Sequence, residues 1–134
     1  MHQEDDSCQR FTLTKSEHLR SRKDIELLLQ QNKVSFAYPF KCCWQLQLHT
    51  DSVPAYHRIA MAVPKRLFKH AVDRNRIKRL VREAYRLNKA ILYEGDASQK
   101  VDMLFVCVCK EIPSYYVVAQ SVKNILKQIA SQLQ

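Results

Sequence analysis

The sequence predicts an α+β fold, a two-layer α/β sandwich in which helices pack on one sheet. Its 134 residues fit a single domain. Apolar residues alternate with a period of two in three segments, 36–48, 58–63 and 102–109, which is typical of strands. Helical spacing in the segments around them gives the order α-β-β-α-β-α, which favours one sheet covered by helices.

Two capping boxes predict the start of the first helix. Thr14 with Glu17, and Ser21 with Asp24, place a hydroxyl three residues before a carboxylate. The helix is expected to end near Gln31. The residues expected on its apolar side are Ile25, Leu28 and Leu29.

A long strand is expected to begin at Phe36. The residues predicted on its apolar side are Phe36, Tyr38, Phe40, Cys42, Trp44, Leu46 and Leu48. Pro39 lacks the N–H that a sheet ladder needs, so the strand is expected to lie at an edge, or to be bent or broken there.

The remaining elements alternate between strands and helices. A short strand begins at Arg58, and Pro64 ends it. A helix follows from Asp73 to Ile91 or Leu92. A strand from Asp102 to Cys109 and a helix from Ser114 to about Leu133 complete the domain. The residues expected on the buried face of the last helix are Val118, Val122, Ile125, Leu126 and Ile129.

Composition excludes several classes of function. The single glycine, Gly95, leaves no glycine-rich phosphate loop, so no nucleotide cofactor is expected. Residues 1–10 are expected to form a flexible acidic tail rather than a signal peptide, and the longest apolar run, 103–109, is too short to span a membrane. A cytoplasmic protein with no membrane partner is therefore expected. Its cysteines should be reduced, with Cys107 and Cys109 buried and no metal site.

The net charge of +9 indicates a polyanionic partner. Much of this charge lies on one side of the helix that begins at Asp73. The residues at helical spacing on its apolar side are Ile77, Leu80, Val81, Ala84 and Ile91. Those on the opposite side are Asn75, Arg79, Arg82, Arg86 and Lys89.

A solvated surface is the ordinary explanation of charges on a helix, but two costs weigh against it here. Lys78, Arg82 and Arg86 repel one another at i,i+4 spacing, by roughly 0.2–0.5 kcal/mol per pair. Arg74 and Arg76 lie in the first turn, where the helix dipole disfavours cations. A bound phosphate relieves both costs, so this helix is predicted to bind phosphates.

The aromatic residues of the long strand allow two interpretations, base stacking and burial in the core. Phe36, Tyr38 and Phe40 beside a cationic surface are typical of proteins that stack unpaired bases. Burial in the core is the more common fate of aromatic residues at this spacing. We expect both, with part of this side buried under the first helix and part lining a groove.

Residues 74–86 read RNRIKRLVREAYR, and this segment closely resembles the arginine-asparagine-arginine helix of the bacterial ribonuclease P protein component. The resemblance extends to four further segments, 11–15, 19–24, 62–66 and 102–106. It implies an α/β sandwich related to a ribosomal-protein domain, with a left-handed βαβ crossover, so that residues 11–134 form a single RNA-binding domain.

The resemblance also implies the function. The family assembles with a large catalytic RNA into ribonuclease P, the endoribonuclease that removes the 5′ leader of precursor tRNA and leaves a 5′ phosphate. The protein is expected to supply no catalytic residue. Mg²⁺ is expected to be held mainly by the RNA and the substrate.

The site residues follow from the matching positions. Those expected to contact RNA are Arg74, Asn75, Arg76, Lys78, Arg79, Arg82 and Arg86 on the helix, with Lys65 and Arg66 in the connector before it. Those expected to line the cleft for the single-stranded leader, between the first helix and the sheet, are Phe36, Tyr38 and Phe40. Ile25 and Leu29 stand where relatives often carry aromatic residues, which lowers the expectation of base stacking from that helix.

Three other functions compete. A protein-only nuclease needs clustered carboxylates, and the acids here are dispersed along the sequence. A structural RNA-binding module shares the charge and differs only in the motif. A DNA-reading helix normally follows a short positioning helix, whereas here a basic connector precedes it.

Overall fold

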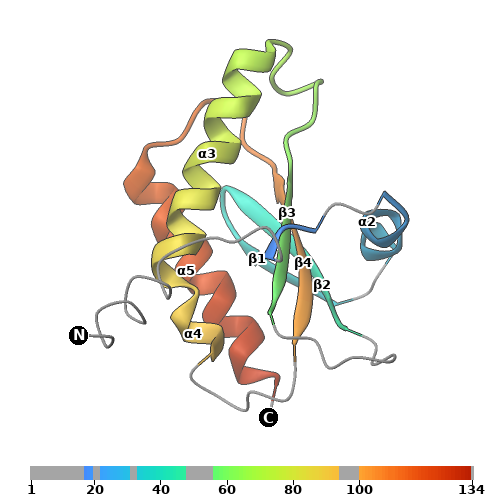
Figure 1. Cartoon of the computed structure of the whole chain (residues 1–134). Coiled ribbons are helices and arrows are strands. Elements are labelled where there is room, and N and C mark those ends of the chain that lie inside the picture. Colours follow the sequence, from blue (N-terminus) through green and yellow to red (C-terminus); the bar gives the residue numbers. More distant parts are fainter. Residues whose placement is uncertain (1–16, 20–21, 31–32, 48–55, 94–99, 134) are drawn as a thin grey trace, which may run out of the picture.

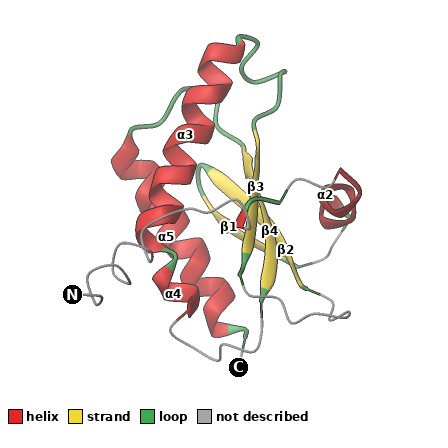
Figure 2. Cartoon of the chain, in the orientation of Figure 1, coloured by secondary structure: helices red, strands yellow, loops and turns green. Residues whose placement is uncertain are grey.

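The computed structural model describes residues 17–19, 22–30, 33–47, 56–93 and 100–133. It shows one four-stranded sheet with helices on both faces (Figures 1 and 2). Its elements are, in chain order, α2 (Arg22–Leu29), β1 (Val34–Ala37), β2 (Phe40–Leu46), β3 (Arg58–Ala62), α3 (Ala71–Asn88), α4 (Ala90–Tyr93), β4 (Val101–Cys107) and α5 (Tyr115–Ser131). The expected acidic tail of residues 1–10 and the hydroxyl residues of both expected capping boxes, Thr14 and Ser21, lie outside the described residues.

The sheet has the strand order β1-β2-β4-β3. β2 runs antiparallel to both β1 and β4, whereas β3 and β4 are parallel neighbours. Two parallel neighbours need a crossover, and α3 with α4 supplies it. The left hand of this βαβ crossover remains a prediction.

The long strand predicted from Phe36 is in fact a hairpin. Val34–Ala37 and Phe40–Leu46 pair with each other and turn at Tyr38 and Pro39, whose peptide bond is cis. A break at Pro39 was one of the expected outcomes, because this residue cannot donate to a ladder. Among the described residues, the observed order is therefore α-β-β-β-α-α-β-α, with one more strand and one more short helix than predicted.

Helices cover both faces of the sheet, so the predicted two layers become three where α2 lies. The larger core cluster joins one face of the sheet to α3, α4 and α5, and contains Phe40, Trp44, Tyr85 and Phe105. A smaller cluster on the other face joins Cys43, Ala60 and Leu104 to Leu28 of α2. Figure 1 shows α2 apart from the other helices, across the sheet.

The helices agree closely with their sequence patterns. The five residues expected on the buried face of α5 are all buried, and the Ser114 hydroxyl accepts a hydrogen bond from the Val117 amide at 3.3 Å to cap its start. On α2, Leu28 is buried, but Leu29 is 57% exposed, so its placement on the packed side was wrong. No helix among the described residues is long and apolar enough to cross a membrane.

Candidate nucleic-acid interface

Helix α3 carries the cationic side that the sequence predicted. Its buried residues Ile77, Val81, Ala84 and Tyr85 face the core. Asn75 and Arg79 lie opposite them and are exposed, with Arg82 and Arg86 half-buried beside them. We call the following set the cationic face of α3: Arg74, Arg76, Lys78, Arg79, Arg82 and Arg86.

Most of these charges lack an acidic partner. Glu83 forms an ion pair with Arg86 at 2.6 Å, which lowers the pKa of the Glu83 carboxyl. Within the described part of the chain, no carboxylate forms an ion pair with Arg76, Lys78, Arg79 or Arg82. Apart from Arg86, the positive charge of the cationic face is therefore uncompensated by the described residues, as a phosphate site requires.

The connector before α3 brings two more cations to the N-terminal end of the helix. Lys65 and Arg66 are exposed in the turn that follows Pro64. Arg74 donates from Nη1 to the Phe68 carbonyl at 2.9 Å, which fixes the connector against the first turn of α3. His70 begins the helix without a side-chain cap, and its carbonyl accepts hydrogen bonds from the third and fourth amides of α3. The first two amides of the helix have no intrahelical acceptor, as at any helix start.

Lys89 does not belong to the cationic face, contrary to the sequence prediction. It is 6% exposed, and its ammonium group contacts both carboxylate oxygens of Glu17, at 2.9 and 2.7 Å. Helix α3 ends at Asn88, and the chain turns at Lys89 before α4. Lys89 is the C-cap residue of α3 with helical backbone angles, one turn after the buried Tyr85, and the buried Glu17 holds its ammonium group away from the cationic face.

A row of four side chains crosses the face of the sheet on which α2 lies. Phe36, Lys41, Val106 and Ala62 are successive ladder partners on β1, β2, β4 and β3. Paired residues point to the same side of a sheet, and their neighbours Cys43, Leu104 and Ala60 pack under α2. We call these four residues the Phe36 row.

The Phe36 row is open to solvent at one end. Phe36 is 54% exposed and Lys41 is exposed, whereas Val106 and Ala62 are half-buried. Ala62 is two residues before Pro64 on the chain, so the row ends next to Lys65 and Arg66. The row thus runs from the exposed Phe36 and Lys41, across the half-buried Val106 and Ala62, to the connector.

Of the three aromatic residues predicted to line the leader cleft, only Phe36 belongs to the Phe36 row, and its contact with the leader stays a prediction. Phe40 is 1% exposed in the core under α3 and α5, so it cannot line a cleft beside α2. Tyr38 is 65% exposed, but it lies in the hairpin turn rather than in the row. Lys41 and Val106 were missed, although the polar side of the period-two pattern contains Lys41.

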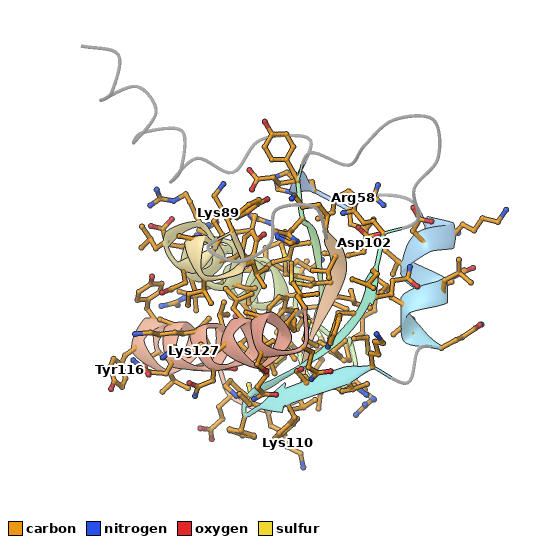
Figure 3. All side chains as sticks on the ribbon, turned by 90° about the horizontal axis from the view of Figure 1, so that it is seen from below. Arg58, Lys89, Asp102, Lys110, Tyr116 and Lys127 are labelled. Carbon is orange, nitrogen blue, oxygen red and sulfur yellow. The ribbon has the colours of Figure 1, made fainter. Side chains whose placement is uncertain are left out.

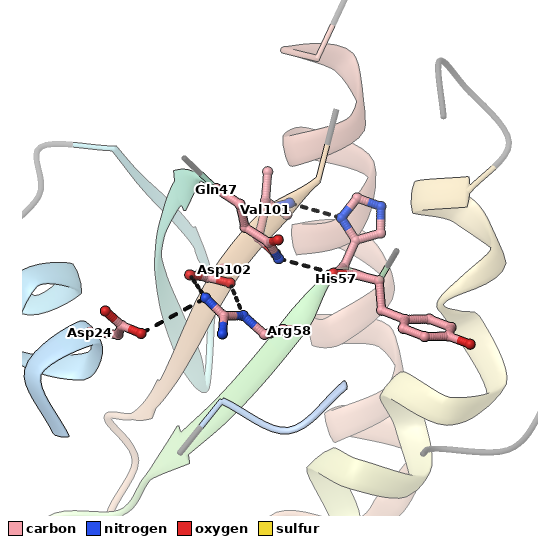
Figure 4. A network of polar contacts seen from close by, with 7 residues as sticks. Asp24, Gln47, His57, Arg58, Val101 and Asp102 are labelled. Carbon is pink, nitrogen blue, oxygen red and sulfur yellow. Dashed lines mark hydrogen bonds and ion pairs between the residues drawn. The ribbon is translucent and has the colours of Figure 1, made fainter. Parts of the chain in front are cut away.

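A buried carboxylate on this face of the sheet binds an arginine that reaches α2. Asp102 of β4, 2% exposed, accepts two hydrogen bonds from Arg58 of β3, at 2.8 and 2.7 Å (Figure 4). The same guanidinium lies 3.8 Å from a carboxylate oxygen of Asp24 on α2. Arg58 therefore links β4 to α2, in addition to the packing of the buried Leu28 on the sheet.

A second polar cluster joins the ends of β3 and β4. His57 accepts a hydrogen bond from the Val101 amide through Nδ1 at 3.0 Å (Figure 4), and its own amide donates to the Tyr93 hydroxyl at 2.9 Å. Burial, with the charge of Lys100 second, lowers the pKa of His57 to about 4.

This pKa predicts acid destabilisation. The unfolded chain protonates His57 near pH 6.5 and the folded protein near pH 4, so the free energy of unfolding should fall as pH drops from about 6.5 to about 4. The loss attributable to His57 is about 3 kcal/mol when complete. Urea unfolding at a series of pH values measures it, and His57→Asn, which keeps an acceptor but does not titrate, should show a shallower slope. Equal slopes for both proteins would contradict the prediction.

The described thiols are buried rather than reactive. Cys107 and Cys109 are both buried as predicted, with sulfur atoms 3.5 Å apart. Burial raises the pKa of Cys107 to about 12, so its nucleophilic thiolate form is rare at neutral pH. Among the described residues, no group of three or more His, Cys, Asp and Glu side chains could hold a metal ion.

Comparison with known proteins identifies the family. The family model described as Ribonuclease P matches residues 13–130. The ribonuclease P protein component of Porphyromonas gingivalis is 34% identical over 125 residues, covering 92% of this chain and 90% of the relative. That of Syntrophus aciditrophicus is 34% identical over 112 residues, covering 77% and 87%.

Solved structures agree with the sequence relatives. The RNase P protein from Thermotoga maritima is similar with a TM-score of 0.66 and 25% identity, over 84% of this chain and 96% of that one. A Staphylococcus aureus RNase P protein, at 18% identity, has the same fold with a TM-score of 0.64, over 86% and 96% of the two chains. With its arginine-asparagine-arginine motif on the exposed side of α3, this chain belongs to the ribonuclease P protein family.

Proposed function

We propose that this chain binds the catalytic RNA of ribonuclease P through the cationic face of α3 and the 5′ leader of precursor tRNA through the Phe36 row. The family is the protein subunit of ribonuclease P, which processes the tRNA 5′ leader. The observation that carries the proposal is the uncompensated positive charge on α3, in the arginine-asparagine-arginine motif.

The cationic face suits the phosphates of a folded RNA. One arginine guanidinium group can bind two oxygens of a phosphate, and the free N–H groups at the start of α3 add to the attraction. Arg74 also orients the connector, so Lys65 and Arg66 approach the same polyanion as α3. A large RNA surface can occupy the helix and the connector together.

The Phe36 row suits a single strand. An exposed aromatic ring stacks an unpaired base of any sequence, and an adjacent lysine neutralises a phosphate. In the proposed complex, the leader crosses the sheet from Lys65 and Arg66, past Val106, to Lys41 and Phe36. The cut bond then lies at the connector end, beside the RNA bound to α3.

The protein's part in the reaction is to position the two RNA molecules. The described carboxylates form no metal-binding group, so the residues present do not fit a resident Mg²⁺, and we assign the metal to the RNA and the substrate. Held there, Mg²⁺ would supply the Lewis-acid chemistry of the cleavage. The protein neutralises RNA phosphates and positions the single-stranded leader.

The test is multiple-turnover cleavage of precursor tRNA at low Mg²⁺ by a bacterial ribonuclease P RNA, with and without this protein. Cleavage at the mature 5′ end that requires both components supports the proposal. A protein that binds RNA tightly without stimulating cleavage is a structural RNA-binding module instead. Cleavage by the protein alone contradicts the assignment of the chemistry to RNA.

Replacing Phe36 tests the leader contact. Phe36→Ala should weaken binding of leader-bearing tRNA to the holoenzyme by about 1–3 kcal/mol, because one stacked base is lost. Binding of mature tRNA should not change. Phe36→Trp, which keeps a stacking ring, is the matched control and should bind both forms normally. Equal loss for both tRNAs would assign the Phe36 ring a structural role.

A further inference from the structure

Arg74 differs from the exposed arginines of α3 in what its guanidinium group binds. Its Nη1 donates to the Phe68 carbonyl at 2.9 Å, six residues back along the chain. Arg74 is half-buried in this position, whereas Arg76 and Arg79 are exposed. The first arginine of the arginine-asparagine-arginine motif therefore has a hydrogen-bond acceptor within the protein.

The Phe68 carbonyl belongs to the connector between β3 and α3, and both ends of this connector are held in place (Figure 1). At one end, the amides of Leu67 and Phe68 donate to the Pro64 carbonyl at 3.1 and 3.2 Å, which closes a turn. At the other end, Phe68 is 7% exposed and belongs to the larger core cluster. The exposed cations Lys65 and Arg66 lie within the turn, so their direction depends on how the turn is held.

The hydrogen bond of Arg74 accounts for a cation in the first turn of α3. The helix dipole disfavours positive charge at this end, and the sequence alone suggested a bound phosphate as the compensation. A charged guanidinium forms a stronger hydrogen bond than a neutral donor does, and the Phe68 carbonyl accepts that bond in the protein without RNA. Arg76, two residues later, has no such partner among the described residues, so its charge is left for a phosphate.

We propose that Arg74 is a positioning residue, which strengthens RNA binding by holding the connector so that Lys65 and Arg66 meet phosphates, and which contacts no phosphate itself. Arg76 then binds phosphate directly, so the two arginines of the motif have different roles. The proposal rests on the proposed function, because it takes the RNA that covers α3 and the connector together. It departs from the expectation that every arginine of the motif contacts RNA.

Amide hydrogen exchange of the free protein tests whether Arg74 holds the connector. Arg74→Gln should accelerate exchange of the Leu67 and Phe68 amides about tenfold or more, the factor that corresponds to one charge-assisted hydrogen bond. Arg76→Gln is the matched control, since it removes the same charge from an exposed position, and it should leave this exchange unchanged. The amides of α5 should exchange at the parent's rate in both variants, which shows that the domain remains folded.

A double-mutant cycle with the catalytic RNA tests how Arg74 acts on binding. Arg74→Gln should weaken binding of a bacterial ribonuclease P RNA by the parent protein about tenfold or more. In a connector variant with Lys65→Gln and Arg66→Gln, the same substitution should change Kd by less than about twofold, because the residues through which it acts are gone. Arg76→Gln should weaken binding about tenfold in both backgrounds, and it should lower the slope of log Kd against log salt concentration by about one.

The outcomes separate the role of Arg74 from the proposed function. If Arg74→Gln weakens binding equally in both backgrounds and lowers the salt slope by about one in each, Arg74 contacts a phosphate, and the proposal is overturned while the proposed function stands. Unchanged exchange in the connector, or faster exchange without a change in RNA affinity, overturns the proposal as well. So does faster exchange throughout α5, because Arg74 would then support the whole domain. If neither Arg76→Gln nor the connector variant changes RNA affinity, the proposed function is overturned too.

Discussion

Lys89→Met should lower the free energy of unfolding by about 3–5 kcal/mol and leave the RNA affinity of the folded protein unchanged. The substitution removes the cation that faces Glu17, itself 1% exposed, and so leaves a buried carboxylate without this partner. A loss of this size is a large part of the roughly 5–15 kcal/mol by which most domains are stable. Urea unfolding measures the stability, and titration with ribonuclease P RNA at several salt concentrations measures the binding.

Two controls define the origin of the loss. Lys127→Met removes an exposed lysine of α5 (Figure 3) and should change stability by less than about 0.5 kcal/mol. The double substitution Glu17→Leu with Lys89→Met should recover much of the loss, because an apolar pair removes the unpaired charge. A Lys89→Met protein of normal stability with a weaker, less salt-dependent RNA affinity would instead place Lys89 on the RNA surface.

Lys89 shows where sequence periodicity stops being informative. Continuing the 100° spacing from Arg82 and Arg86 places Lys89 among the phosphate-binding residues. The helix ends at Asn88, however, and the partner of Lys89 lies 72 residues away in sequence. Lys89 keeps helical backbone angles, so the spacing itself does not fail there, but a carboxylate this distant in sequence leaves no local signal.

The hairpin at Pro39 shows a similar limit for strands. Alternation of apolar residues continues through Tyr38 and Phe40 as if one strand were present. The turn between them reverses the chain, so Phe36 and Phe40 lie on opposite faces of the sheet. Sequence therefore predicted the aromatic residues but not their separation, which depends on the pairing register.

Elements with a strong local pattern were predicted well. The buried face of α5 and the strand near Asp102 have apolar residues at regular spacing and no conflicting breaker. The cationic side of α3 was also correct except for Lys89, because a single helix carries its other residues. The Phe36 row needs four strands in register, so only Phe36 of its members could be named from the sequence.

Arg79→Gln with Arg82→Gln should weaken binding of the catalytic RNA by about 3 kcal/mol or more, about a hundredfold in Kd. Each arginine is expected to contribute a charge-assisted hydrogen bond of about 1.5–3 kcal/mol. Two lost phosphate contacts should also lower the slope of log Kd against log salt concentration by about two. The slope is the more specific measurement, because it counts contacts independently of their strength.

The same variant should be at least as stable as the parent protein. Lys78, Arg82 and Arg86 repel one another at i,i+4 spacing, and removing the middle charge relieves about 0.2–0.5 kcal/mol per pair. Glutamine forms helices about as readily as arginine, so the change tests charge rather than helix formation. A variant that is more stable than the parent protein but binds RNA more weakly indicates that the removed charges serve to bind RNA.

Lys123→Gln with Lys127→Gln supplies the matched control. It removes the same two charges from α5, the helix packed beside α3, so it changes net charge equally without touching the cationic face. If both double variants reduce the salt slope alike, RNA affinity depends on net charge alone and the specific role of α3 is contradicted. If only the α3 variant does, the arginines of its motif contact phosphates directly, and the unpaired charges of α3 are explained by the RNA they bind.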